Sequence, residues 1–94
     1  MPYVKLADGR VRFVWPNCSA RSVFLVGDFN DWDERSHPLR KAAAEKYEIE
    51  VHLRPGNYRF KYLIDGIWWN DPEAEAYEPN PWGSEDSVIR ISGK

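Results

Sequence analysis

The chain has 94 residues, 43% of them hydrophobic and 15% aromatic, which suits one small domain with a single core. Thirteen Lys and Arg against fifteen Asp and Glu give a net charge of −2, which argues against the basic surface of a nucleic-acid-binding protein. No stretch is long and apolar enough to span a membrane, and residues 1–10 lack the apolar part of a secretory signal, so we expect no membrane partner and a cytoplasmic location.

The cysteine and histidine content also excludes some classes of site. Cys18 is the single cysteine, which excludes an internal disulfide and a cysteine zinc cluster and fits a reducing compartment. His37 and His52 do not have the spacing of metal ligands. We therefore expect no metal and no cofactor.

Short alternating segments, separated by turns, predict strands throughout the chain. Residues 39–46 are ambiguous, since KAAAEK favours a helix but is too short to hold one alone. We interpret them as a strand end and a connecting turn, with a one-turn helix as the alternative. The other expected elements are an edge strand or arm at 1–7, strands at 10–15, 22–26, 47–53 and 87–92, a polar loop at 27–38 and a proline-bearing loop at 71–86.

The central hairpin is expected at residues 58–70, YRFKYLIDGIWWN, around the turn signal Asp65-Gly66. A two-residue turn there pairs Ile64 with Ile67, Leu63 with Trp68, Tyr62 with Trp69 and Lys61 with Asn70. Alternation then predicts one face for the core and one for solvent. The predicted core face carries Tyr58, Phe60, Tyr62, Ile64, Ile67 and Trp69, and the outer face carries Lys61, Leu63, Trp68 and Asn70.

Six or seven short strands without a long helix predict an all-β fold, an immunoglobulin-like antiparallel β-sandwich of about seven strands that forms one domain over residues 1–94. The core must depend on packing alone, because the cysteine pair of such sandwiches is absent.

Five tryptophans divide into two groups. Trp15 and Trp69 fall on core-facing positions and are predicted to be buried. Trp32, Trp68 and Trp82 fall on loops or on the outer face, where each is either an anchor that pins its loop or part of a sugar-binding platform. Flat indoles can cover the C–H face of a pyranose, while lysine, asparagine and aspartate side chains bond its hydroxyls. Such a platform predicts weak binding to a polymer.

Two blocks of sequence resemble the family-48 carbohydrate-binding modules. These are the early-set domains of glycogen branching enzymes and isoamylases and the glycogen-binding domain of AMP-activated protein kinase β subunits. SVFLVGDFNDW at 22–32 is close to the branching-enzyme form, and PGNYRFKYLIDGIWWNDP at 55–72 is similar to the second block. The resemblance covers residues 10–91 and implies a β-sandwich that binds α-1,4-glucans, such as glycogen or starch, without hydrolysing them.

The resemblance also assigns site residues one by one. Trp32 and Trp68 match the two tryptophans that stack on glucose, and Lys61 matches the lysine that binds hydroxyls. Where the kinase-type domain has a leucine, a threonine and an asparagine, this chain has Trp82, Ser84 and Asp86. The candidate carbohydrate-binding residues are Trp32, Trp68, Lys61, Trp82, Ser84, Asp86 and Asn70.

Other function classes are weaker. Asp28, Asp31, Asp33 and Glu34 are acidic, but nothing pairs them with a second carboxylate at the separation a glycosidase needs, and solvated turns explain them. Hence we expect no catalytic residues. The net charge argues against a single-strand nucleic-acid platform. The alternative function is a protein-interaction module that docks onto a catalytic domain or a kinase subunit, and the chain is either a whole small protein or an excised domain.

Overall fold

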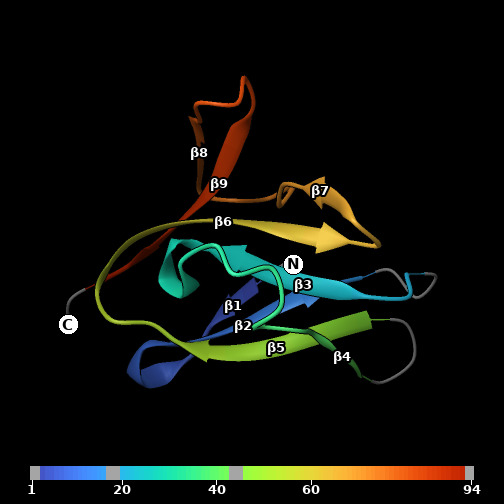
Figure 1. The fold of residues 1–94 in the computed structure, drawn as a ribbon. Helices are drawn as coiled ribbons and strands as arrows, with labels where there is room; N and C mark the ends of the chain where they lie inside the picture. The colour runs from blue at the N-terminus through green and yellow to red at the C-terminus, as the bar shows by residue number, and fades with distance from the viewer. Residues whose placement is uncertain (1–2, 17–19, 43–45, 93–94) are drawn as a thin grey trace.

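The computed structural model describes residues 3–16, 20–42 and 46–92, and this part of the chain is all β apart from two short 3₁₀ turns, η1 (Ala7–Gly9) and η2 (Asp28–Asn30) (Figure 1). Its strands are β1 (Tyr3–Lys5), β2 (Arg10–Trp15), β3 (Val23–Gly27), β4 (Arg40–Ala42), β5 (Lys46–His52), β6 (Gly56–Ile64), β7 (Ile67–Trp69), β8 (Ala76–Pro79) and β9 (Glu85–Ile91).

The strands form two antiparallel sheets that face each other as a sandwich, as predicted (Figure 1). One sheet has the order β1-β2-β5-β4 and the other β3-β6-β9-β8, with β7 added to β6. The alternating segments at 10–15 and 47–53 pair with each other through residues 10–15 and 47–52, with Phe13 opposite Ile49. Each of these strands therefore turns one set of side chains toward the opposite sheet.

The core lies between the sheets and is rich in aromatic rings. Phe13 of β2 and Phe60 of β6 are fully buried and meet edge to face, with ring centroids 5.3 Å apart. Tyr62 meets Phe60 in the same way at 5.9 Å. Burying one such ring is worth about 1.5 to 3 kcal/mol. Since the sheets bring together rings from distant segments, hydrophobic packing stabilises their association without a disulfide.

The central hairpin has the predicted register, with Tyr62 opposite Trp69, Leu63 opposite Trp68 and Ile64 opposite Ile67. The prediction that Ile67 and Trp69 are buried is wrong, because they are 60% and 49% exposed. Both lie on the core side of the sheet but at the hairpin end. There the Trp69 ring lies beside the half-buried Trp15 ring, with the ring centroids 6.2 Å apart. Alternation gives the face of a strand but not how far the opposite sheet covers it.

Two further predictions are corrected. The segment 71–86, predicted as a loop, contains β8, which pairs with the start of β9 to make a hairpin that projects from the body (Figure 1). The ladder of β7 stops at Trp69, so Asn70 does not pair with Lys61 as predicted. The chain therefore has nine strands in its described part instead of about seven. Within residues 39–46, β4 confirms the predicted strand end, and residues 43–45 lie outside the described residues. Cys18 also lies outside them.

Strand β6 is the central strand of the second sheet, and its outward side chains form the middle of the outer face. It pairs with β3 along one edge, and its other edge is shared by β9, opposite residues 56–60, and β7, opposite residues 62–64. Outward side chains of β6 thus lie between the loop after β3 and the β8–β9 hairpin. Within residues 3–16, 20–42 and 46–92, no helix is long and apolar enough to cross a membrane.

Candidate functional site

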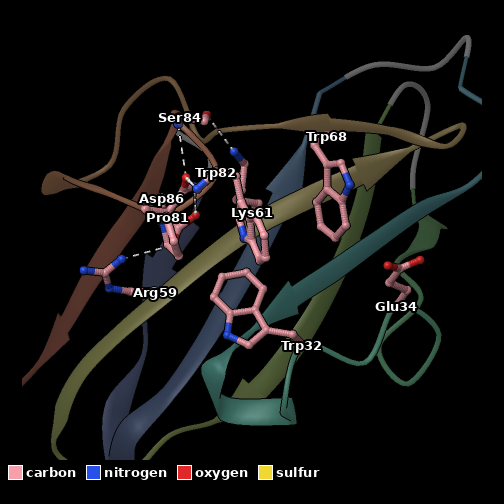
Figure 2. Close-up of a pocket in the computed structure, with 10 residues that line it drawn as sticks. Trp32, Glu34, Arg59, Lys61, Trp68, Pro81, Trp82, Ser84 and Asp86 are labelled. Carbon is pink, nitrogen blue, oxygen red and sulfur yellow. Dashed lines mark hydrogen bonds and ion pairs between the residues drawn. The ribbon is translucent and has the colours of Figure 1, made fainter.

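An open groove of about 860 Å³ lies over the outward side chains of β6 (Figure 2). The loop after β3, the end of the central hairpin and the loop between β8 and β9 supply its walls. The residues that line it are Trp32, Glu34, Arg59, Lys61, Trp68, Asn80, Pro81, Trp82, Ser84 and Asp86.

Trp32 reaches the groove from a tight loop that is held by Asn30. The Asn30 side chain accepts a hydrogen bond from the Gly27 amide and donates one to the Leu25 carbonyl, each at 3.1 Å. The Trp32 amide donates to the Gly27 carbonyl at 2.8 Å. Asp31 and Trp32 both have φ of 57°, the left-handed region that non-glycine residues seldom adopt. This turn aims the Trp32 indole, which is 37% exposed, over β6.

The same loop is fastened to the sandwich at two more points. Both carboxylate oxygens of Asp28 accept from the Arg59 amide of β6 at 3.2 Å. Burial raises the pKa of Asp28, although the hydrogen bond from Arg59 opposes the shift. The Phe29 ring stacks on Phe13 of the core at 6.4 Å. In GDFNDW, most of the residues therefore position the loop, and Trp32 is the one that lines the groove.

Trp68 enters the groove from β7, opposite Leu63 of β6. It is 43% exposed and points to the outer side, whereas its neighbour Trp69 points to the other side of the sheet. The structure brings Trp32 and Trp68, which come from separate segments, to one surface (Figure 2). Alternation on a hairpin of known register accounts for the direction of Trp68.

Lys61 lies on the groove floor between the tryptophans and the β8–β9 hairpin. Its Nζ donates to the Glu85 carbonyl at 3.0 Å and to Ser84 Oγ at 3.4 Å. An ammonium group has three donors, so one remains for a ligand hydroxyl. Ser84 Oγ keeps its own proton for a ligand as well. Lys61 and Ser84 therefore present a polar edge beside the indoles.

The loop between β8 and β9 carries Trp82 at its tip. Asn80 Oδ1 accepts from the Trp82 amide at 3.0 Å and from the Ser84 amide at 3.1 Å, which closes the turn. Gly83 takes the left-handed conformation with φ of 81°. The Trp82 side chain is 86% exposed. Its indole is thus held out into solvent by the backbone of its loop and not by packing.

Asp86 lines the groove but is engaged inside the protein. It is only 5% exposed, and its two oxygens accept from Asn80 Nδ2 at 2.9 Å and from the Arg59 guanidinium at 3.2 Å. Arg59 also bonds Glu78 Oε1 at 2.7 Å. A carboxylate is an acceptor only, which suits a position between two donors. The structure therefore gives Asp86 a positioning role for the Trp82 loop.

Asn70 is not among the residues that line the groove. Its Nδ2 donates to the Glu85 carbonyl at 2.9 Å, and its Oδ1 accepts from Ser87 Oγ at 2.8 Å. Both parts of the amide thus join the end of β7 to the start of β9. Asn70 Nδ2 and Lys61 Nζ donate to the same Glu85 carbonyl, so Asn70 lies beside Lys61, but both ends of its amide are engaged inside the protein.

Four lining residues were not among the candidates: Glu34, Arg59, Asn80 and Pro81. Arg59 had a signal, since it lies two residues before Lys61 and alternation gives both the same face. The signal for Asn80 was weaker and consisted of the dipeptide Asn80-Pro81, which is typical of turns. Nothing local indicated Glu34, because its position depends on the path of the loop after β3.

The groove combines flat apolar rings with an amine and a hydroxyl, which are the groups that a pyranose ring needs on its face and on its rim. Within residues 3–16, 20–42 and 46–92, no group of three His, Cys, Asp or Glu residues is arranged to hold a metal ion. The arrangement is suited to stacking and hydrogen bonding with a neutral polyhydroxylated chain.

Comparison with known proteins agrees with this chemistry. Residues 10–94 match the family described as "Glycogen recognition site of AMP-activated protein kinase". The chain is 41% identical over 82 residues to phosphoglucan phosphatase LSF1 of Arabidopsis thaliana, which covers 86% of this chain and 14% of that protein. It is 29% identical over 79 residues to the β-1 subunit of 5'-AMP-activated protein kinase of Sus scrofa, covering 84% of this chain and 61% of the subunit.

A bacterial enzyme gives a shorter match at higher identity. Over 55 residues the chain is 64% identical to the 1,4-alpha-glucan branching enzyme GlgB of Novosphingobium aromaticivorans, which covers 56% of this chain and 7% of the enzyme. The chain therefore spans less than two thirds of each of these three relatives.

Proposed function

The chain belongs to the family of glycogen recognition sites of AMP-activated protein kinase. From this we propose that its groove binds α-1,4-glucans, such as glycogen, starch and maltooligosaccharides. One observation supports this proposal most: Trp32 and Trp68 line the same groove as Lys61. The indoles of Trp32 and Trp68 stack on glucose rings, while Lys61 and Ser84 bond hydroxyls. Trp82 closes on the sugar from its loop.

The expected affinity is weak. If each indole removes about 100 Å² of apolar surface from water, two rings contribute roughly 5 kcal/mol at about 25 cal/mol/Å². Association costs several kcal/mol, and the hydrogen bonds to hydroxyls replace bonds to water. The net binding free energy corresponds to a Kd in the high micromolar to millimolar range. Such a module attaches a larger assembly to a polymer that offers many sites.

We propose that this chain binds the glucan without hydrolysing it. The carboxylates that line the groove are Glu34 and Asp86, which Figure 2 places at opposite ends. Asp86 is only 5% exposed, and its two oxygens accept from Asn80 and from the Arg59 guanidinium inside the protein. A glycosidase requires two carboxyl groups on either side of one bond. This arrangement supports a binding role for the groove.

Calorimetric titration with maltoheptaose tests the proposal, with two neighbouring tryptophans as a matched pair. Trp68 and Trp69 are similarly exposed but point to opposite sides of the sheet. We expect Trp68→Ala to weaken binding at least tenfold, because it removes one stacking ring, and Trp69→Ala to bind like the wild type.

Circular dichroism and urea unfolding of both variants control for folding. Equal affinity of Trp68→Ala and the wild type contradicts the proposed groove. Absence of binding by the wild type at millimolar maltoheptaose contradicts glucan binding itself.

The second candidate is a module that docks onto a glucan-active enzyme or a kinase subunit. Exposed Ile67 and Trp69, on the side of the sheet away from Trp68, favour it. The relatives named above include a branching enzyme and a kinase β subunit, so a catalytic domain or a kinase subunit is the proposed partner. Co-purification with such a partner, lost in Trp69→Glu and kept in Trp68→Ala, supports this role. The cytoplasmic location remains a proposal, since the plant relative is chloroplastic.

A further inference from the structure

A second hollow of about 360 Å³ lies beside the groove and is lined by Ser22, Phe24, Glu34, Arg35, Leu63 and Gly66. We propose that it is an additional subsite, which holds glucose units of the same linear α-1,4-glucan beyond the unit stacked on Trp68. This inference rests on the proposed function, because the groove must first bind the glucan.

The floor of the hollow is apolar and continues the surface of the groove. Phe24 of β3 and Leu63 of β6 are directly opposite each other in the ladder. Both lie on the outward side of the sheet and are only half-buried. Leu63 is also the partner of Trp68 across the hairpin. A sugar ring that leaves the Trp68 indole therefore meets an apolar surface made of these two side chains.

The rim of the hollow supplies polar groups of both kinds. Glu34 lines the groove and the hollow, so the two cavities are adjacent. In the described part of the chain, the Glu34 carboxylate and the Arg35 guanidinium make no hydrogen bond or ion pair. An unengaged acceptor and an unengaged donor face the hollow together, and both can bond sugar hydroxyls.

The direction of the hollow favours a continuing linear chain as its occupant. Lys61 and Leu63 are alternate outward residues of β6, roughly 7 Å apart along the strand. Glu34 lies at the end of the groove away from Arg59 and Asp86 (Figure 2). The hollow thus extends the groove along β6, past Trp68 toward the Asp65-Gly66 turn, and the same chain can occupy both.

The experiment compares maltotriose, which is too short to fill both cavities, with maltoheptaose, by calorimetry on the wild type, Leu63→Ser and Arg35→Ala. We expect the wild type to bind maltoheptaose at least tenfold more tightly than maltotriose. The longer sugar has more binding registers, but this advantage is the same in each protein. Both variants should reduce maltoheptaose affinity about threefold to tenfold and leave maltotriose affinity unchanged.

Val4→Ser is the matched control, because Val4 is an exposed apolar residue on the other sheet. It should leave both affinities unchanged. The same maltoheptaose to maltotriose ratio in wild type, Leu63→Ser and Arg35→Ala overturns the subsite while the groove stands. If Leu63→Ser also loses maltotriose, Arg35→Ala decides, since Arg35 lies outside the groove lining. A wild type that binds neither sugar refutes the proposed function, and the subsite with it.

Discussion

The two loops that bring tryptophans to the groove are built in different ways. The loop of Trp32 is fastened to the sandwich through Asp28 on the β6 backbone and through Phe29 in the core. The loop of Trp82 projects at the end of a hairpin and is held by polar contacts that centre on Asn80. The exposed fractions of the indoles, 37% and 86%, reflect this difference.

The comparison indicates a division of work between the loops. A ring that the core already holds loses little freedom when a sugar stacks on it, so most of its stacking energy appears as affinity. A ring on a projecting loop must be ordered by the ligand, which costs part of the energy gained. We therefore propose that Trp32 forms a fixed platform with Trp68 and that Trp82 is an adjustable contact.

The largest expected effect is on the free energy of unfolding. It compares Gly27, at the start of the Trp32 loop, with Gly83, in the Trp82 loop. A Cβ on Gly27 would lie 2.4 Å from the Arg59 carbonyl, so Gly27→Ala must displace β3 or β6. We expect it to lower the free energy of unfolding by about 3 kcal/mol. Gly83 has open space around it but φ of 81°, so Gly83→Ala should cost only about 1 kcal/mol. Urea unfolding measures both. A cost for Gly83→Ala that equals or exceeds the cost for Gly27→Ala contradicts the contrast.

The second prediction concerns the base of the β8–β9 hairpin, which rests on buried Asp71. Its amide donates to Ser87 Oγ of β9 at 2.9 Å, and its carbonyl accepts from the Tyr77 hydroxyl of β8. Burial raises the pKa of the Asp71 carboxyl to about 6. The folded state thus keeps the proton where the unfolded chain, with a pKa of about 3.9, has lost it.

The consequence is a loss of stability as pH rises. The unfolded chain releases its proton first, so Asp71 should reduce the free energy of unfolding progressively from about pH 4 to 6 and no further above that range. Between pH 5 and 7 we expect about 1 to 2 kcal/mol of this loss. Asp71→Asn keeps an acceptor for the Glu73 amide and should remove this component of the slope. Parallel pH profiles for the variant and the wild type would refute the assignment.

The third prediction tests whether polar contacts alone hold the Trp82 loop. Asn80→Ala removes the acceptor of the Trp82 and Ser84 amides and the donor to Asp86. We expect a loss of about 1 to 2 kcal/mol and fast hydrogen exchange at those two amides. Exposed Asn57 of β6 provides the control, and Asn57→Ala should leave these amides unchanged. Retained protection in Asn80→Ala would mean that something other than Asn80 closes the turn.

The fourth prediction concerns the affinity for maltoheptaose. Trp32→Ala should weaken maltoheptaose binding at least tenfold, whereas Trp82→Ala should weaken it only about threefold, because ordering the projecting loop offsets part of its stacking energy. Isothermal titration of both variants under the same conditions gives the ratio. An equal or greater loss from Trp82→Ala would reverse the assignment of platform and adjustable contact.

Local patterns predicted much of the fold and less of the site. Asp65-Gly66 and period-two alternation were enough for the hairpin register and the outward direction of Trp68. They were not enough for Trp69, since its burial depends on the reach of the other sheet. Strand β8 was missed because four residues that end in Pro79 carry no alternation signal.

The site residues show the same limit. The sequence resemblance predicted that Asp86 binds hydroxyls, but in the structure its partners are Arg59 and Asn80. Arg59 is distant in sequence, and Asn80 lies on the other side of the β8–β9 turn. Both neighbours are donors, which suits an aspartate at this position, because a carboxylate only accepts hydrogen bonds. Six of the ten lining residues were among the predicted candidates, but their hydrogen-bond partners could not be predicted.

The most direct test is one NMR titration of the indole N–H signals of the five tryptophans with maltoheptaose. If the groove binds the glucan, the signals of Trp32, Trp68 and Trp82 should shift together along one saturation curve, while those of Trp15 and Trp69 stay in place. A spectrum in which Trp69 shifts while Trp32 and Trp68 remain still, or in which no signal moves at millimolar sugar, would contradict the account.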